Sequence, residues 1–140
     1  MPIVIFDKWD GEYGIKKYII DKTGCNPYSG AGICYRKEKK TSILKSVDNT
    51  LYYDDDLSDE NNVKYTLFGH NNDQDEKEKR FNEPLLNKEK TEHIYLYRVT
   101  NKKKYIWYGK YKIIDKNTKF HPGKNGIKRN IIILTLQKIY

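Results

Sequence analysis

The feature that most constrains the fold is a series of short runs of β-branched and aromatic residues separated by turn-rich stretches. Such runs predict β-strands, and here they lie at residues 2–6, 31–35, 63–68, 94–99, 105–108, 111–114 and 131–136. Gly109 and Lys110 separate the fifth run from the sixth, and a turn is predicted at 123–126, after Pro122. The last run is continuously apolar, which predicts a buried strand.

Helix signals are few. Residues 11–20 are compatible with a short helix or an extended segment. Asn72 or Asp73 is a candidate cap for a short helix over 74–81, whose acidic residues come early and whose basic residues come late, as the helix dipole favours. Many strands with one or two short helices predict a β-barrel or another α+β domain. The 140 residues are enough for one domain, 1–140, with one core.

The charge is unevenly distributed. The net charge is +8, yet residues 1–70 hold 10 Lys and Arg against 11 Asp and Glu, whereas residues 94–140 hold 12 against the single acid Asp115. This asymmetry favours a polyanionic partner, although a solvated lysine face is the alternative. Residues 1–10 lack the pattern of a signal peptide, and no apolar run reaches the length of a membrane span. We therefore expect an intracellular protein of the nucleus or cytoplasm, not secreted and without a membrane partner.

The residues that commonly bind metals show no clustered spacing. Cys25 and Cys34 are far apart, and His70, His93 and His121 are scattered, so no zinc site is predicted. No Ser-His-Asp or Cys-His arrangement and no phosphate loop is recognisable either. The sequence predicts no metal, no cofactor and no catalytic residue, and a binding protein is favoured over an enzyme.

An acidic segment runs through Asp54, Asp55, Asp56, Asp59 and Glu60. A calcium loop that starts at the first of these aspartates needs glycine at its sixth position and glutamate at its twelfth. The sequence has aspartate and tyrosine there, so this interpretation fails. A metal-dependent nuclease or a base-modifying enzyme stays an alternative, and so does a solvated loop.

Aromatic residues flank this acidic segment. Tyr52 and Tyr53 precede it and Tyr65 follows it. A carboxylate between two rings is what a pocket for an extruded base requires, because the rings stack on the base and the carboxylate accepts from an exocyclic amino group. The segment is therefore a candidate base pocket.

Several motifs occur in one order along the chain: Gly30-Ala31-Gly32-Ile33, Tyr53-Asp54-Asp55-Asp56, Tyr65-Thr66, Asp73-Gln74, Asn82 with Leu85, the run 94–98, the hairpin 105–113, and Gly126 with Arg129. Over residues 30–137 this order resembles the SRA (SET- and RING-associated) domain, a member of the PUA-like group. The resemblance implies a mainly β, α+β fold: an SRA-type curved β-barrel with short flanking helices.

The resemblance also implies a function. The family flips a base out of DNA and holds it between two tyrosines, which correspond here to Tyr53 and Tyr65. Asp56 would read the Watson–Crick edge of the base, and Thr66 would lie near the modified carbon. Leu67 and Phe68 replace the glycine that the family has after that threonine. The implied function is non-catalytic recognition of 5-methyl- or 5-hydroxymethylcytosine in double-stranded DNA.

Candidate phosphate-binding residues are Arg98, Lys102, Lys103, Lys104, Lys110, Lys128 and Arg129. The two arginines are equally suited to pairing with acidic side chains within the protein. Two other binding functions stay open: an RNA-binding PUA-like module, and a protein-interaction domain that has lost its pocket.

Overall fold

A computed structural model describes the chain except for residues 29–31, 49–54, 70–71 and 124. The strands are β1 (Val4–Phe6), β2 (Ile33–Arg36), β3 (Thr41–Val47), β4 (Asn62–Thr66), β5 (His93–Val99), β6 (Tyr105–Pro122) and β7 (Lys128–Lys138). The helices are α1 (Ile15–Thr23) and α2 (Asn82–Leu86), with a 3-10 turn, η1, at Lys37–Lys39. Each predicted run contains or overlaps a strand, which confirms a mainly β fold.

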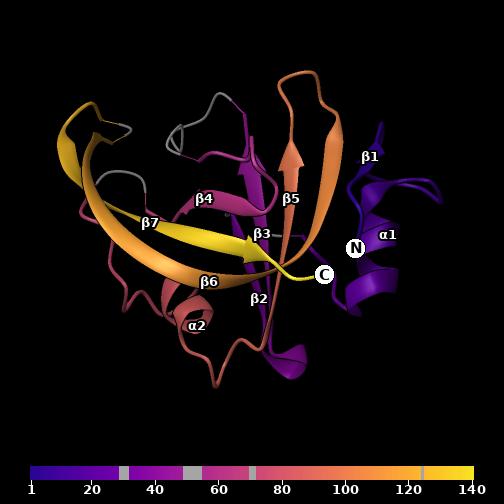
Figure 1. Cartoon of the computed structure of the whole chain (residues 1–140), viewed down its shortest axis with the longest axis horizontal. Coiled ribbons are helices and arrows are strands. Elements are labelled where there is room, and N and C mark those ends of the chain that lie inside the picture. Colours follow the sequence, from indigo (N-terminus) through magenta and orange to yellow (C-terminus); the bar gives the residue numbers. More distant parts are fainter. Residues whose placement is uncertain (29–31, 49–54, 70–71, 124) are drawn as a thin grey trace.

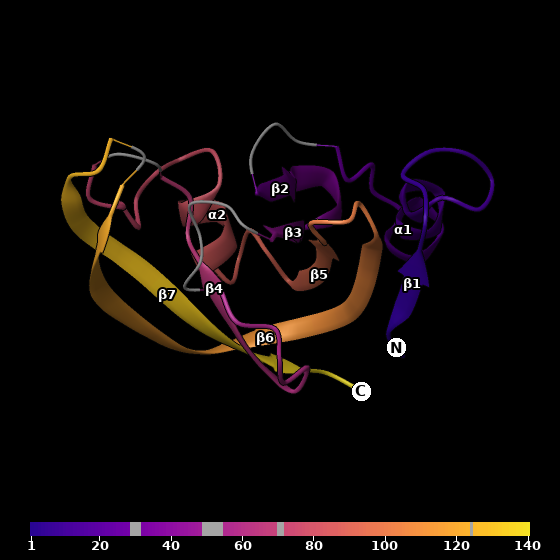
Figure 2. The same cartoon turned by 90° about the horizontal axis from the view of Figure 1, so that it is seen from above.

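The strands form one seven-stranded sheet in the order β2-β3-β5-β6-β7-β4, and β1 pairs with β6 beside this path. The described pairs are antiparallel except for β3 with β5, which run parallel. The long β6–β7 hairpin bends through the whole molecule and curls the sheet (Figure 1). Seen from above, α2 lies inside the curve and α1 lies outside it (Figure 2). The predicted curved barrel with short flanking helices is confirmed.

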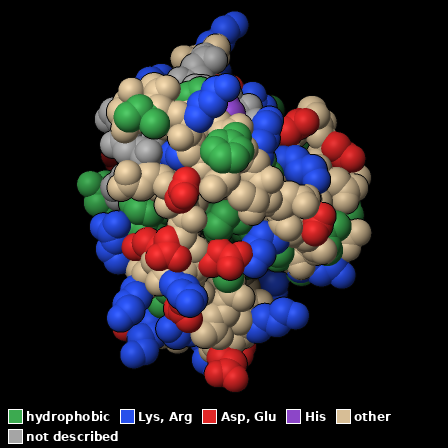
Figure 3. Space-filling view, turned by 90° about the vertical axis from the view of Figure 1, so that its left-hand side faces the viewer, with side chains coloured by type: hydrophobic (Ala, Val, Ile, Leu, Met, Phe, Trp, Pro, Cys, Tyr) green, Lys and Arg blue, Asp and Glu red, His purple; other side chains and the backbone are tan. Residues whose placement is uncertain are grey.

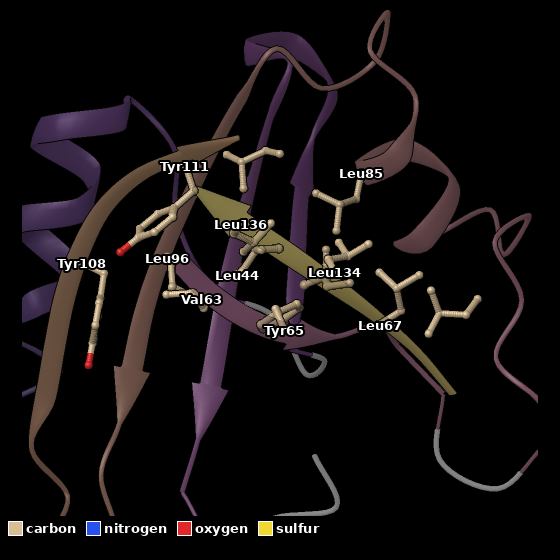
Figure 4. Packing of buried hydrophobic residues seen from close by; sticks show 13 residues of the cluster. Leu44, Val63, Tyr65, Leu67, Leu85, Leu96, Tyr108, Tyr111, Leu134 and Leu136 are labelled. Carbon is tan, nitrogen blue, oxygen red and sulfur yellow. The ribbon is translucent and has the colours of Figure 1, made fainter. Parts of the chain in front are cut away.

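Two hydrophobic clusters cover the two faces of the sheet. The inner cluster includes Leu44 from β3, Tyr65 from β4 and Leu134 from β7, whose side chains converge inside the curve (Figure 4). The outer cluster packs α1 against the other face, with Ile15 and Trp107 fully buried. Neighbouring residues of a strand point to opposite faces, so β3 and β5 each supply side chains to both clusters.

The prediction of two separate strands at 105–108 and 111–114 was wrong, because β6 runs without interruption from Tyr105 to Pro122. Gly109 lies within it at φ +102, opposite a register shift between Leu96 and Tyr97. A glycine in this conformation makes a β-bulge, which bends a strand without ending it.

The predicted helix over 74–81 was also wrong; the helix in this region is α2, at Asn82–Leu86. Gln74 instead pairs with β7: its backbone N–H donates to Asn130 O at 2.9 Å, and its side-chain Oε1 accepts from Ile132 N at 2.7 Å. Asp73 Oδ1 accepts from Asn130 N at 2.7 Å, so its side chain bonds β7 rather than capping a helix. These tertiary bonds override the local helix signal.

The N-terminal segment folds back onto α1. The backbone amides of Ile15 and Lys16 donate to the carbonyls of Lys8 and Trp9 at 3.0 and 3.1 Å. A Cβ on Gly14 would come within 2.4 Å of the Trp9 carbonyl oxygen, so this turn needs glycine. The predicted helix over 11–20 is therefore displaced toward the C-terminus. Within the described part of the chain, neither helix is long and apolar enough to cross a membrane.

Candidate nucleic-acid interface

Side chains link β4 to the opposite end of the curled sheet. The hydroxyl of Tyr65 donates to the carbonyl oxygen of Gly32 at 2.8 Å and to that of Lys45 at 3.3 Å. Gly32 permits this approach, since a Cβ there would lie 3.1 Å from the tyrosine oxygen. The ring is 2% exposed and belongs to the inner cluster. Tyr65 thus ties β4 to β3 and to the residue before β2.

A carboxylate of the acidic segment strengthens the same link. Asp55 accepts from the backbone N–H of Thr66 at 2.7 Å and from the hydroxyl of Ser46 at 2.8 Å. Ser46 is on β3 and Thr66 on β4, so one carboxylate holds two elements that are not adjacent in the sheet. The sequence predicts no role for either Asp55 or Ser46, because the contact joins residues that are remote along the chain.

Asp56, the predicted base-reading residue, is exposed. Its backbone forms an isolated antiparallel bridge with Lys64. Oδ1 accepts from the N–H of Ser58 at 2.9 Å and from its hydroxyl at 2.6 Å. These hydrogen bonds lower the pKa of Asp56, so its carboxylate is ionised and acts only as an acceptor at neutral pH.

Thr66, the residue predicted near the modified carbon, is 4% exposed. Its hydroxyl has no hydrogen-bond partner in the described part of the chain. A buried hydroxyl without a partner costs about 1–3 kcal/mol, which marks this position as a place where a ligand could bind. The two bulky residues after it face other partners: Leu67 is fully buried in the inner cluster, and the ring of Phe68 lies 4.9 Å from that of Phe81.

Three of the four predicted pocket residues therefore lie on or beside β4. Asp56 pairs with that strand, and Tyr65 and Thr66 are its last two residues. The fourth, Tyr53, lies outside the described residues, as do Gly30 and Ala31 of the first motif.

The two predicted phosphate-binding arginines have partners within the protein. Arg98 forms a two-pronged ion pair with Asp48, with N–O distances of 2.7 and 2.8 Å. Arg129 is 3% exposed, and its Nη1 donates to the carbonyls of Gly69 at 2.5 Å and Asn72 at 3.1 Å. Both side chains stabilise loops, and a phosphate contact by either stays a prediction.

The five predicted lysines differ in their surroundings. Lys102, Lys103 and Lys128 are exposed and form no ion pair with the described residues. Lys104 pairs with Asp7, and Lys110 Nζ lies 2.8 Å from His93 Nδ1. On the side of the β6–β7 bend, basic side chains alternate with acidic ones (Figure 3). The surplus of lysines in the C-terminal third therefore does not give a uniform basic field on that face.

No group of three or more metal-ligating side chains occurs among the described residues. Cys25 and Cys34 are buried free thiols in the outer cluster. Burial raises the pKa of Cys34, which keeps it protonated at neutral pH.

Comparison with known proteins identifies one family. The model of the ScoMcrA-like SRA domain family matches residues 10–140. A search of curated protein sequences found no match.

Solved structures share this fold, and two of the three described next are named as SRA domains. The structure of the sulfur-binding and SRA domains of ScoMcrA with phosphorothioated DNA has a TM-score of 0.68 at 14% identity, and covers 99% of this chain and 40% of that one. The SUVH5 SRA complex with fully methylated CG DNA has a TM-score of 0.63 at 21% identity, and the match covers 96% of this chain and 88% of that one. The modification-dependent restriction endonuclease TagI has a TM-score of 0.60 at 17% identity, and the match covers 98% of this chain and 49% of that one.

This chain thus spans less than half of the ScoMcrA and TagI chains that it resembles. At these identities the likeness establishes the fold, and the activities of those longer proteins lie beyond it.

Proposed function

The chain belongs to the ScoMcrA-like SRA domain family, and on that premise we propose that it is a non-catalytic reader of double-stranded DNA that carries a modified base. We further propose that the base is a modified cytosine and that it is flipped out of the duplex. Structures with the same fold contain phosphorothioated DNA in one case and methylated CG DNA in another, which supports modified DNA as the ligand class.

The observation that carries the proposal is the combination of polar groups beside the end of β4. Asp56 is an ionised, exposed acceptor whose Oδ1 is held by Ser58, while its Oδ2 has no partner among the described residues. Thr66 has a buried hydroxyl without a described partner. Together they offer an acceptor for an exocyclic amino group and a second polar contact, which are the groups that recognition of a flipped cytosine uses.

The aromatic part of the proposed pocket consists of Tyr65 and Tyr53. The hydroxyl contacts of Tyr65 hold its ring in one orientation, so little side-chain entropy is lost when a base stacks on it. Since the ring is 2% exposed, we propose that the base enters by displacing a neighbouring side chain. Tyr53 would then cover the other face of the base.

Competition binding on matched duplexes tests this function. We expect a 5-methylcytosine or 5-hydroxymethylcytosine duplex to bind several-fold to about a hundredfold more tightly than the plain duplex, because one methyl group in a tight pocket contributes about 1–3 kcal/mol. RNA of the same sequence and a phosphorothioated duplex complete the panel. Asp56→Asn should remove most of the preference, since the amide offers a donor to the amino group of the base.

Asp59→Asn is the matched control. Asp59 belongs to the same acidic segment, is exposed, and accepts from the backbone N–H of Asn61 at 2.9 Å, as Asp56 accepts from Ser58. This variant should keep the preference. Equal affinity of the wild-type protein for every duplex would remove the modified-base function, and tighter binding to RNA would favour the RNA-binding alternative.

A further inference from the structure

A hollow lies on the face of the sheet opposite the inner cluster. On β3, Ser46 points to the Asp55 side, whereas Lys45 points to the α1 side, and on β5 Tyr97 shares that outer face. The hollow measures about 330 Å³ and lies among these residues, Trp9 and Tyr105. Its volume is at the lower end of the range typical of small-molecule sites.

Aromatic rings form its wall. The ring centroid of Trp9 lies 5.9 Å from that of Tyr97 and 5.8 Å from that of Tyr105. The turn before α1 fixes Trp9, because its carbonyl accepts from Lys16 and the turn closes only with a glycine at position 14. The wall is thus held by backbone contacts, and it offers a surface on which a planar ring can stack.

Tyr28 stands at the rim of the hollow and is 69% exposed. Its position is defined by Arg36, whose Nη2 donates to the Tyr28 carbonyl at 2.9 Å and whose Nε donates to that of Asn26 at 3.0 Å. An exposed ring at a rim whose backbone is bound in this way can close over a ligand that rests on the wall.

Among the described residues, the lining carries two cations and no acidic side chain. Lys45 is partly buried on β3, and burial lowers its pKa. Its ammonium has no carboxylate partner in the described part of the structure. A desolvated cation without a partner is unfavourable, and a bound anion would offset that cost.

Lys103 supplies the second cation. It has a left-handed backbone, with φ +61, in a turn where its N–H donates to Thr100 O at 3.0 Å. This conformation is unfavourable for a residue with a side chain, so it marks a position that the turn imposes. Lys104, the next residue, pairs with Asp7, whereas Lys103 has no ion pair in the described structure and lines the hollow.

We propose that this hollow is a second nucleotide site, in which a base stacks on the wall formed by Trp9, Tyr97 and Tyr105, and a phosphate pairs with Lys45 and Lys103. The ligand chemistry is that of one nucleotide, supplied either by a strand of bound nucleic acid or by a free mononucleotide. An aromatic wall with cations and no acid matches both halves of a nucleotide, whereas it leaves a cationic or purely aliphatic ligand without a counterpart.

The test follows the methyl NMR signals of Val47 and Val99, which line the hollow, while the full chain is titrated with dAMP, deoxyadenosine, inorganic phosphate or a short single-stranded DNA. We expect dAMP or the oligonucleotide to shift both valines. Loss of the Lys45 charge in Lys45→Met should weaken dAMP binding about tenfold or more, because charge-assisted bonds are the strong ones. The same substitution should weaken the binding of deoxyadenosine, which has no phosphate, much less.

Lys37→Met is the matched control, since Lys37 is an exposed lysine in η1 outside the hollow. A shift with dAMP indicates that a free mononucleotide suffices; a shift only with the oligonucleotide, still sensitive to Lys45→Met, assigns the site to a unit of a strand. Unshifted valines with every probe, or inorganic phosphate competing as well as dAMP, would overturn the proposal.

The proposed second site and the proposed base pocket can be refuted independently. Asp56→Asn should leave dAMP binding unchanged, and Lys45→Met should leave the preference for a modified over a plain duplex unchanged. Loss of the preference in Lys45→Met, with intact folding, would show that the hollow and the base pocket are one site, and would contradict the second site.

Discussion

The hydrogen bonds of the Tyr65 hydroxyl link β4 to β3, and removing them tests how much this link stabilises the curled sheet. Tyr65→Phe keeps the buried ring and removes only the bonds to Gly32 O and Lys45 O. The Gly32 carbonyl also accepts from Lys45 N at 2.7 Å, so it keeps one partner when the hydroxyl is lost. We therefore expect Tyr65→Phe to lower the unfolding free energy by about 1 kcal/mol, the typical net contribution of a hydrogen bond.

That loss converts into a modest change of Tm. A domain of this length has an unfolding entropy of about 0.3 kcal/mol per kelvin, so Tm should fall by about 3 °C. Tyr65→Ala would cost about 3–5 kcal/mol by emptying the core, which would confuse a loss of stacking with unfolding. Because Tyr65→Phe preserves the ring, its affinity for modified DNA should change by less than about threefold.

A double-mutant cycle with Gly32→Ala sharpens the test. The new methyl group would lie 3.1 Å from the Tyr65 oxygen and should destabilise the wild-type protein by about 1 kcal/mol or more. In the Tyr65→Phe background that oxygen is absent, so the two changes together should cost less than their sum by about 0.5 kcal/mol or more. Urea unfolding of the four proteins measures this. Strict additivity, or no loss in Tyr65→Phe, would refute the link between β4 and β3.

Three further outcomes can be measured. Arg129→Met removes the buried charged donor of the Gly69 and Asn72 carbonyls, so we expect a loss of about 1.5–3 kcal/mol in urea unfolding and faster amide exchange at Gln74. Burial raises the pKa of Glu78, but hydrogen bonds from Arg80 and three backbone amides outweigh burial and lower the pKa. The stability that ionised Glu78 contributes is therefore present above about pH 4.3 and is lost as the pH falls through the folded-state pKa. Glu78→Gln should accordingly reduce the dependence of unfolding free energy on pH between about pH 5 and pH 3. Lys102→Gln with Lys103→Gln should weaken all duplexes alike and reduce the slope of log K against log salt by up to about 2, whereas an unchanged slope would show two solvated side chains.

Local patterns were sufficient to predict most strands. Residues 94–99 and 131–136 lie in central strands of the sheet, and both predictions agree with β5 and β7. The nearly continuous apolar character of 131–136 reflects burial on both faces. The strand at Thr41–Val47 escaped prediction, although Ile43 and Leu44 are among its buried residues. Three of its polar residues, Thr41, Ser42 and Ser46, are buried too. Ser42 bonds Thr91 and Ser46 bonds Asp55, so no alternation of polar and apolar residues reveals the strand.

Long-range contacts explain what the sequence could not predict. The residues around Gln74 are compatible with a helix, but its side-chain amide bonds both Leu67 O, directly after β4, and Ile132 N, on β7. Asp55 and Asp56 are neighbours of one type in the same motif, and yet one holds β4 to β3 while the other faces solvent. Sequence order does not distinguish such roles, because burial decides them.

The acidic motif and Tyr65-Thr66 were nevertheless found in the right order and on adjacent parts of the fold. Tyr65 comes nine positions after Asp56, and the backbone of Asp56 pairs with Lys64, directly before Tyr65 in β4. The family resemblance thus located this region of the fold, whereas the individual contacts within it are evident only from the structure.

Fluorescence of 2-aminopurine tests base flipping most directly. The probe replaces the base at the target position, or the one beside a 5-methylcytosine, and its emission rises when it leaves the stack. We predict a rise with the wild-type protein and with Asp59→Asn, and a much smaller one with Asp56→Asn or Tyr53→Ala. Binding at the same affinity to modified and plain duplexes, without any rise in emission, would contradict the account.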